Sequence, residues 1–353
     1  MEAKINFDAY FENALNLNED ELQIREATLP LLPDTIIDAH THASHQRFID
    51  EYDMPSHIKA HMMSTFPQVD IEQSQEIDRT LMPGKEIHKI RFAHVYPNLG
   101  QRAVTEYIKS ENTEKDSVAL FGLSNSPDEI DYTISELEKG DYSALKMYYL
   151  NSIPPKETVY EYFPHQVLEV AQKQEVPIIL HLPKSLYESS NEAIDVAEKY
   201  PDLKIILAHI GVANVPKPEL GSTLESLSKH PNILVDTAMV DNATIVTEAL
   251  GHLGAERILY GSDEPLNLMR IASFFNPDLQ RDRVLTDYPY HWADQAEQKK
   301  WRHLVTTPLV HSHWRQISAI IDSVRTLSHN TDEEDSSLES IFNTNAKNTF
   351  PNM

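Results

Sequence analysis

The 353-residue sequence has no cysteine and few basic residues for its size. The absence of cysteine excludes disulfides, thiolate-bound zinc, iron–sulfur clusters and thiol catalysis. The 30 Lys and Arg stand against 55 Asp and Glu, so the formal net charge is −25 and no basic footprint for nucleic acid or an anionic membrane is expected. Any metal ion must therefore be held by carboxylates and by some of the 17 histidines.

Long hydrophobic runs are also missing. No stretch approaches the roughly 18 apolar residues that could span a bilayer. The first residues, MEAKINFDAYFENALNLNEDELQ, are acidic and lack the charged and apolar regions of a secretory signal. We therefore expect a cytoplasmic protein that acts on a small molecule. The apolar content of 41% suffices for a large core, which argues against a disordered acidic chain.

Short apolar runs rich in Ile, Leu and Val recur along the chain, with helical patterns between them. They begin at Thr35, Lys89, Ser117, Ser143, Val176, Lys204, Asn232 and Arg257. Such runs are typical of strands that are buried on both faces of a parallel sheet. From the second run onward the starts are about 25 to 33 residues apart, which is one strand, one helix and two loops. The pattern predicts an α/β fold, a (β/α)8 TIM barrel, in preference to a doubly wound open sheet.

Three segments fall outside this repeat. Residues 1–34 are expected to form an N-terminal helical extension before a barrel over residues 35–353. A long insertion after the first strand, about 43–88, and a C-terminal helical extension, about 266–353, are expected to cover the barrel mouth. The acidic stretch from Thr331 is expected to be a solvated loop.

Polar residues stand at the ends of these apolar runs. His40 and His42 are two apart in the first run, so a strand would turn both imidazoles to one face and toward one ion. Later runs end in His181, His209 and Asp263, and the fourth contains Lys146. Buried polar groups in apolar strands are costly unless paired or metal-bound, and barrel enzymes place their chemistry at these strand ends. The pattern predicts a metal or catalytic site.

The segments IDAHTH, LHLPK, ILAHIG and GAERILYGSDEP carry a resemblance to a known family. Together with the tail SIFNTNAKNTF, which contains Asn345-Ala346, they resemble the amidohydrolase superfamily, in particular its amidohydrolase-related (amidohydrolase 2) branch of metal-dependent TIM-barrel hydrolases. The resemblance spans about residues 35–350. It implies that His40, His42 and Asp263 bind a divalent ion, most often zinc, with manganese or iron as alternatives.

The number of ions stays open at this point. In mononuclear relatives the counterpart of His181 completes one site and the counterpart of His209 acts on substrate or water, which is the arrangement we favour. In binuclear relatives a carboxylated lysine, here Lys146, bridges two ions, and the second ion is held by the counterparts of His181 and His209. In either arrangement Asp263 would serve as general base and then acid, and His209 could stabilise an oxyanion.

The expected activity is hydrolysis of an amide, cyclic amide or lactone by metal-activated water. A metal-dependent decarboxylase, which is a C–C lyase of the same superfamily, uses nearly the same ligands. A metal-independent lactonase and a non-catalytic barrel are weaker alternatives. Oligomerisation is common in the superfamily, so we expect a homo-oligomer.

Other residues are secondary candidates. Arg270 could bind a substrate carboxylate, and His94 could line the pocket. Glu264 is interpreted as a structural or rim carboxylate. His311 and His313 are interpreted as non-ligands, because residues two apart on a helix do not share a face. Residues 290–292 (Tyr, His, Trp) could contribute to a lid.

Overall fold

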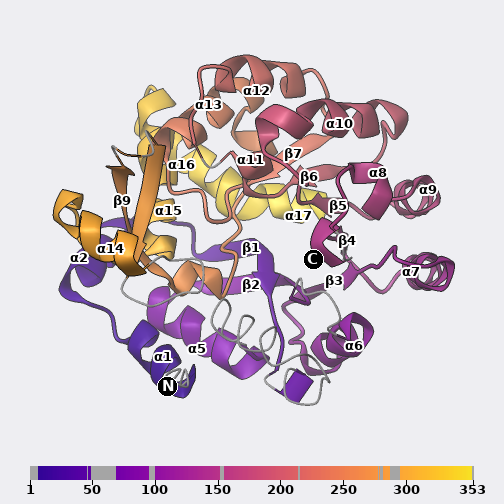
Figure 1. The fold of residues 1–353 in the computed structure, drawn as a ribbon, viewed down its shortest axis with the longest axis horizontal. Coiled ribbons are helices and arrows are strands. Elements are labelled where there is room, and N and C mark those ends of the chain that lie inside the picture. The colour runs from indigo at the N-terminus through magenta and orange to yellow at the C-terminus, as the bar shows by residue number, and fades with distance from the viewer. Residues whose placement is uncertain are drawn as a thin grey trace.

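A computed structural model describes residues 7–45, 47–48, 69–94, 100–151, 155–213, 215–276, 278, 281–286 and 295–351 of the chain. Its centre is a sheet of eight strands in which each strand pairs in parallel with the next along the chain (Figure 1). The strands are β1 (Thr35–His42), β2 (Glu86–Phe92), β3 (Ser117–Phe121), β4 (Ala144–Met147), β5 (Ile178–Leu180), β6 (Ile205–Leu207), β7 (Ile233–Asp236) and β8 (Ile258–Leu259). The predicted (β/α)8 barrel is confirmed.

The first and last strands meet through backbone hydrogen bonds just beyond β8. Ala39 donates to the carbonyl of Tyr260 at 2.9 Å, and Asp263 donates to the carbonyl of His40 at 2.8 Å. These bonds bring the carboxyl end of β1 next to the segment that follows β8. Any functional residues on the two segments therefore become neighbours despite their separation in the sequence.

Helices surround the barrel between the strands (Figure 1). They are α5 (Ile71–Leu81), α6 (Gln101–Glu111), α7 (Pro127–Lys139), α8 (Val159–Tyr162), α9 (His165–Lys173), α10 (Leu186–Lys199), α11 (His209–Val212), α12 (Leu220–Ser228) and α13 (Ala243–Leu253). Their ends follow local chemistry: in α7, Ser126 caps the first turn by accepting from the Glu129 amide, and Gly140 ends the helix at φ 76°. None of the helices in the described part of the chain is both long and apolar enough to cross a bilayer.

The described part of the N-terminal segment contains the helices α1 (Phe7–Leu15) and α2 (Glu19–Thr28). Asn18 and Glu21 form a capping box at the start of α2. The side chain of Glu21 is fully buried. Its contacts with the C-terminal extension, described below, hold α2 against the rest of the molecule.

The C-terminal extension is not purely helical. Its described residues contain an antiparallel sheet in the order β10-β9-β11 and several helices. These elements are β9 (Arg270–Asn276), β10 (Arg281–Thr286), α14 (Gln295–Trp301), β11 (Val310–His311), α15 (Ser312–Leu327), α16 (Thr331–Glu339) and α17 (Asn345–Thr349). The helix α15 packs against α13, as an eighth outer helix of the barrel would.

The acidic stretch from Thr331 is solvated, but the prediction of a loop is wrong. It forms α16, in which the Asn330 side chain accepts from the Glu333 amide. The acidic side chains in its first turn interact favourably with the positive end of the helix dipole. After α16 the tail reaches the barrel, where the Asn345 side chain donates to the carbonyls of Ala255 and Ile258 at 2.7 and 2.8 Å.

Candidate metal centre

Three residues, from the first strand and from the segment after the last strand, form a compact buried group. His40 and His42 lie on β1 and Asp263 follows β8, and one ligand atom from each lies within 4.8 Å of the others. The Oδ1 atom of Asp263 is 3.2 Å from Nε2 of His42 and 3.5 Å from Nε2 of His40. Two imidazoles and a carboxylate are a donor set that suits zinc, manganese or iron. The group therefore fits a divalent ion.

The strand-end histidines all present the same nitrogen to the site. In each, Nδ1 is bonded to an oxygen acceptor, which leaves Nε2 as the nitrogen with a lone pair. The acceptors are the Asp236 carboxylate for His40 (2.8 Å) and the carbonyls of Ala93 for His42 (3.1 Å), Leu182 for His181 (2.9 Å) and Ala238 for His209 (2.8 Å). The imidazoles are thus held in the tautomer that a metal ligand or a proton acceptor needs.

His181 and His209 extend this group. The ring of His209 lies 4.9 Å from that of His40, and the ring of His181 lies 5.1 Å from that of His209. The predicted strand-end residues are therefore neighbours in space. The compact three-residue group itself contains neither His181 nor His209.

The protonation states suit metal binding. Burial lowers the pKa of His40 well below its ordinary value, and the nearby Lys146 ammonium adds to this effect. Burial also lowers the pKa of His181, with contributions from His209 and Lys146. Burial alone would raise the pKa of Asp263, but the adjacent His42, together with His209 and His40, brings it below its ordinary value. Neutral imidazoles beside an ionised carboxylate are ready to bind a cation.

Two of these residues have a strained backbone. His209 and Asp263 have φ values of 58° and 60°, a left-handed conformation that is rare for residues other than glycine. Hydrogen bonds hold both in place, since the His209 amide donates to Asp236 at 2.7 Å and the Asp263 amide donates to the His40 carbonyl at 2.8 Å. Such strain persists only where the surroundings enforce it, and it is concentrated at functional sites.

Lys146 is a buried cation on β4. Among the described residues its Nζ atom has no hydrogen-bond partner, and it lies 5.2 Å from the centre of the Phe92 ring. Burial lowers its pKa from 10.5 to about 8, although Asp236 and Asp263 partly offset this. A desolvated lysine of this kind can lose its proton near neutral pH, which a structural lysine in an ion pair does not do.

Asp236, at the end of β7, was not among the residues selected from the sequence. Its Oδ2 atom accepts from His40, and its Oδ1 atom accepts from the amides of His209 and Ala238 at 2.7 and 3.1 Å. It closes the apolar run NILVD just as His209 closes KIILAH. The signal that identified the other residues could therefore have found it.

Two tyrosines also border the site without having been predicted. The rings of Tyr148 and Tyr149 lie 4.8 and 5.6 Å from the ring of His181. They follow Lys146 and Met147 at the end of β4, in the run ALKMYYL. Burial raises the pKa of Tyr148 well above its ordinary value, so its hydroxyl stays protonated.

Of the secondary candidates, His94 lies beside the metal group and Arg270 does not. The His94 ring stacks on His42 with centroids 5.0 Å apart and planes at 3°. Arg270 is buried against α2, where its Nε donates to Glu21 at 2.8 Å and its Nη atoms donate to carbonyls of Asn13 and Asn16. The guanidinium is therefore paired with Glu21 and lies apart from the metal group.

The other secondary candidates occupy structural positions. The Glu264 carboxylate is buried and bound to Lys89 at 2.7 Å. The amide of His311 donates to Glu21 at 2.9 Å, and Nδ1 of His313 lies 3.4 Å from the Tyr260 hydroxyl. Neither histidine belongs to the three-residue metal group. Residues 290–292, the suggested lid, lie outside the described residues.

Comparison with known proteins identifies the family. A family model described as Amidohydrolase (Amidohydro_2) matches residues 37–304. No curated protein matches the chain. Similar solved structures include amidohydrolase 2 from Bifidobacterium longum subsp. infantis and a candidate 2-pyrone-4,6-dicarboxylic acid hydrolase from Pseudomonas putida, both 13% identical with a TM-score of 0.53, covering 90% of this chain and 98% of theirs. A 5-carboxyvanillate decarboxylase from Novosphingobium aromaticivorans, complexed with manganese, is 12% identical with a TM-score of 0.52, covering 89% of this chain and 95% of its own.

Proposed function

Because the chain belongs to this amidohydrolase family, we propose that it is a metal-dependent hydrolase that cleaves an amide, cyclic amide or lactone. The observation that carries the proposal is the group of His40, His42 and Asp263, whose facing atoms are lone-pair donors in a buried site. A divalent ion at such a group supplies a Lewis acid, which polarises a carbonyl and lowers the pKa of water from about 15.7 toward 7.

The chain's own residues would hold the ion and move the proton. His40 and His42 would hold it through Nε2, and His181 would complete the site if one ion is bound. The ionised Asp263 accepts a proton from the attacking water and returns it to the leaving group. His209, with Nδ1 hydrogen-bonded to the Ala238 carbonyl, places its Nε2 where it can accept or donate a proton at the substrate. Zinc is our first choice of metal.

Lys146 decides between one ion and two. Because its pKa is near 8, a fraction of Lys146 is the neutral amine at neutral pH, and this amine can add to CO2 and release a proton to give the carbamate that would hold a second ion. If Lys146 is not carboxylated, its ammonium form instead offers a cation to a negatively charged part of the substrate. Metal stoichiometry separates the two cases, because only the carbamate would hold a second ion.

A decarboxylase is the second candidate. It is favoured by the manganese-complexed decarboxylase among the structural neighbours, and by the unpaired Lys146 ammonium, which could bind the substrate carboxylate. The two candidates differ in their product, since hydrolysis consumes water and decarboxylation releases CO2.

The test begins with protein purified without chelator and analysed for bound metal. We expect one divalent ion per chain, lost in Asp263→Asn and retained in Asp241→Asn, a matched change at a residue whose side chain instead pairs with Arg315. Protein that holds no metal would refute the proposal. The loaded enzyme is then incubated with 2-pyrone-4,6-dicarboxylate, a lactone, and separately with 2,6-dihydroxybenzoate. Ring opening supports the hydrolase, whereas release of CO2 without hydrolysis supports the decarboxylase.

A further inference from the structure

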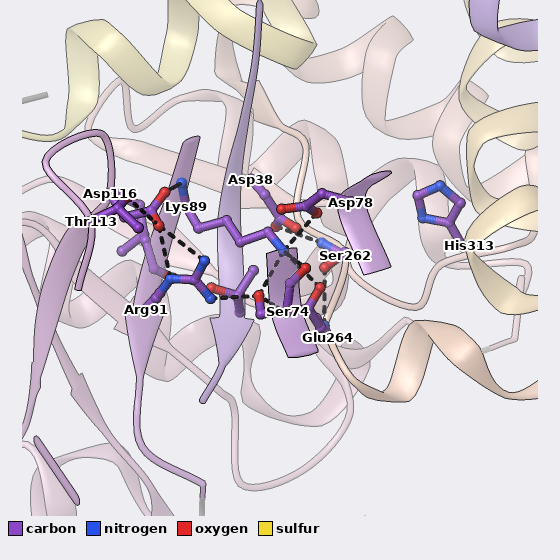
Figure 2. A network of polar contacts seen from close by, with 12 residues as sticks. Asp38, Ser74, Asp78, Lys89, Arg91, Thr113, Asp116, Ser262, Glu264 and His313 are labelled. Carbon is purple, nitrogen blue, oxygen red and sulfur yellow. Dashed lines mark hydrogen bonds and ion pairs between the residues drawn. The ribbon is translucent and has the colours of Figure 1, made fainter. Parts of the chain in front are cut away.

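The carboxylate of Glu264, the residue after Asp263, lies in a buried polar network (Figure 2). Its Oε2 atom accepts from Lys89 Nζ at 2.7 Å, and its Oε1 atom accepts from the Ser74 hydroxyl. The same ammonium binds Ser74 Oγ at 2.9 Å and Asp78 at 2.7 Å. An ionised side chain with this many charge-assisted contacts has little freedom to move.

The network ties separate elements together. Lys89 and Arg91 lie on β2, Ser74 and Asp78 on α5, and Glu264 follows β8 (Figure 2). Arg91 anchors the far end by donating to Ser74 Oγ at 2.6 Å and pairing with the Asp116 carboxylate at 3.0 Å. The position of the Glu264 side chain is therefore set by a strand and a helix rather than by its own loop.

The backbone carries this constraint to the metal group. The Glu264 carbonyl accepts from the His42 amide at 2.8 Å, and the Asp263 amide donates to the His40 carbonyl at 2.8 Å. On the other side, the Ser262 amide donates to Asp38 at 2.8 Å. Asp263 itself has φ 60°, a conformation that does not persist without support. The Glu264 contacts supply that support on its C-terminal side.

We propose that Glu264, held by Lys89 and Ser74, is the positioning residue for Asp263 and thereby sets the metal affinity of the site. The proposal rests on the proposed function, since it presumes that Asp263 is a ligand. Groups that orient a ligand without touching the ion are known to affect metal affinity strongly. If the ion pair served folding alone, its loss would lower stability and leave metal affinity unchanged.

The test compares two isosteric changes in buried carboxylates. Glu264→Gln removes the charge that binds Lys89, and Glu21→Gln removes an equally buried charge that binds Arg270 away from the metal group. Zn²⁺ affinity is measured for chelator-treated full-length proteins by competition with a chromophoric chelator, and their unfolding temperatures are measured without metal. We expect both variants to be less stable, Glu264→Gln to bind Zn²⁺ about 10- to 100-fold more weakly, and Glu21→Gln to bind it like the wild type.

A second variant covers the case in which Glu264→Gln does not fold. Ser74→Ala keeps the Lys89–Glu264 pair and removes the hydroxyl that donates to Oε1 and accepts from Lys89 and Arg91, so it should weaken Zn²⁺ binding by a smaller factor in the same direction. Wild-type affinity in a folded Glu264→Gln or, failing that, in Ser74→Ala overturns the proposal. Equal weakening by Glu21→Gln overturns it as well. A wild-type protein that binds no Zn²⁺ would instead refute the proposed function.

Discussion

A substitution at Asp236 can change the tautomer of His40 without altering any residue of the metal group. Its Oδ2 atom accepts the Nδ1 proton of His40 at 2.8 Å, and its Oδ1 atom accepts the amides of His209 and Ala238. In Asp236→Asn the two backbone amides hold the side-chain oxygen at the Oδ1 position. The new NH2 group then faces His40 Nδ1 and can only donate to it. His40 is driven to carry its proton on Nε2, where a metal ion would have to bind.

The magnitude follows from this hydrogen bond. To bind metal through Nε2, the variant must return the His40 proton to Nδ1, so that two donors face each other in a buried site. A buried donor without a partner costs about 1–3 kcal/mol. At about 1.4 kcal/mol per factor of ten, this predicts a metal affinity about 5- to 140-fold weaker than that of the wild type. Folding should survive, because both backbone hydrogen bonds to the side-chain oxygen remain.

The assay is Zn²⁺ competition with a chromophoric chelator, combined with nitrogen NMR of the imidazoles in the metal-free protein. We expect His40 to change from the Nδ1-protonated to the Nε2-protonated tautomer. Asp241→Asn is the matched control, since its side chain pairs with Arg315 at 2.7 Å and does not contact the histidines. An unchanged tautomer, or a changed tautomer with unchanged Zn²⁺ affinity, would show that the reasoning is wrong.

Two further predictions concern the pH dependence of stability in the metal-free protein. Lys146→Met should raise the free energy of unfolding by up to about 3 kcal/mol at pH 7, because burial lowers the ammonium pKa from 10.5 to about 8. Urea unfolding should show this gain in the free energy of unfolding shrinking between pH 8 and 10.5. In this range the wild type becomes more stable as the pH rises, because Lys146 is already deprotonated in the folded protein but still protonated in the unfolded chain. A gain that does not change with pH would contradict the prediction. Burial lowers the pKa of His313 from 6.5 to about 3, so unfolding takes up a proton in this range and acid destabilises the protein. In His313→Phe, the free energy of unfolding measured by urea denaturation between pH 6.5 and 4.5 should fall less steeply, by about 1.4 kcal/mol per pH unit. The same pH dependence in the variant and the wild type would count against the prediction.

The barrel and the positions of its strand-end residues could be predicted because both follow from backbone periodicity. Residues two apart on a strand share a face, and parallel strands end at the same edge of the sheet. These rules place His40 beside His42 and bring Asp263 to them from the far end of the repeat, as observed. Such rules give the location of a side chain, but not the direction in which its donor atom points.

Some features escaped prediction even though their signals were present. Asn330 and Glu333 have the spacing of a helix cap, yet the acidity of the segment suggested a loop, and the structure has α16 there. Asp236 ends its run in the same manner as Asp263. The sequence does not distinguish a carboxylate that belongs to the metal group, such as Asp263, from one that hydrogen-bonds to Nδ1 of a histidine, such as Asp236.

Other features depend on pairings that no local pattern carries. Lys89 and Glu264 are 175 positions apart, and a buried lysine in β2 could pair with any carboxylate that folding brings near it. Arg270 likewise pairs with Glu21, which is 249 positions away in the sequence. Its place in the sequence, soon after Asp263, had instead suggested a contact with substrate. Long-range ion pairs become visible only once the tertiary structure is known.

The difference between backbone contacts and long-range side-chain contacts also explains how the site can be ordered before a metal binds. Carbonyl oxygens, which mutation cannot remove, hold Nδ1 of His42, His181 and His209. Only His40 relies on a side chain, that of Asp236. Asp263, whose φ of 60° opposes its own preference, relies on its neighbours in the chain. Apart from the three residues of the metal group, we therefore expect metal binding to be most sensitive to substitution at two carboxylates outside it, Asp236 behind His40 and Glu264 beside Asp263.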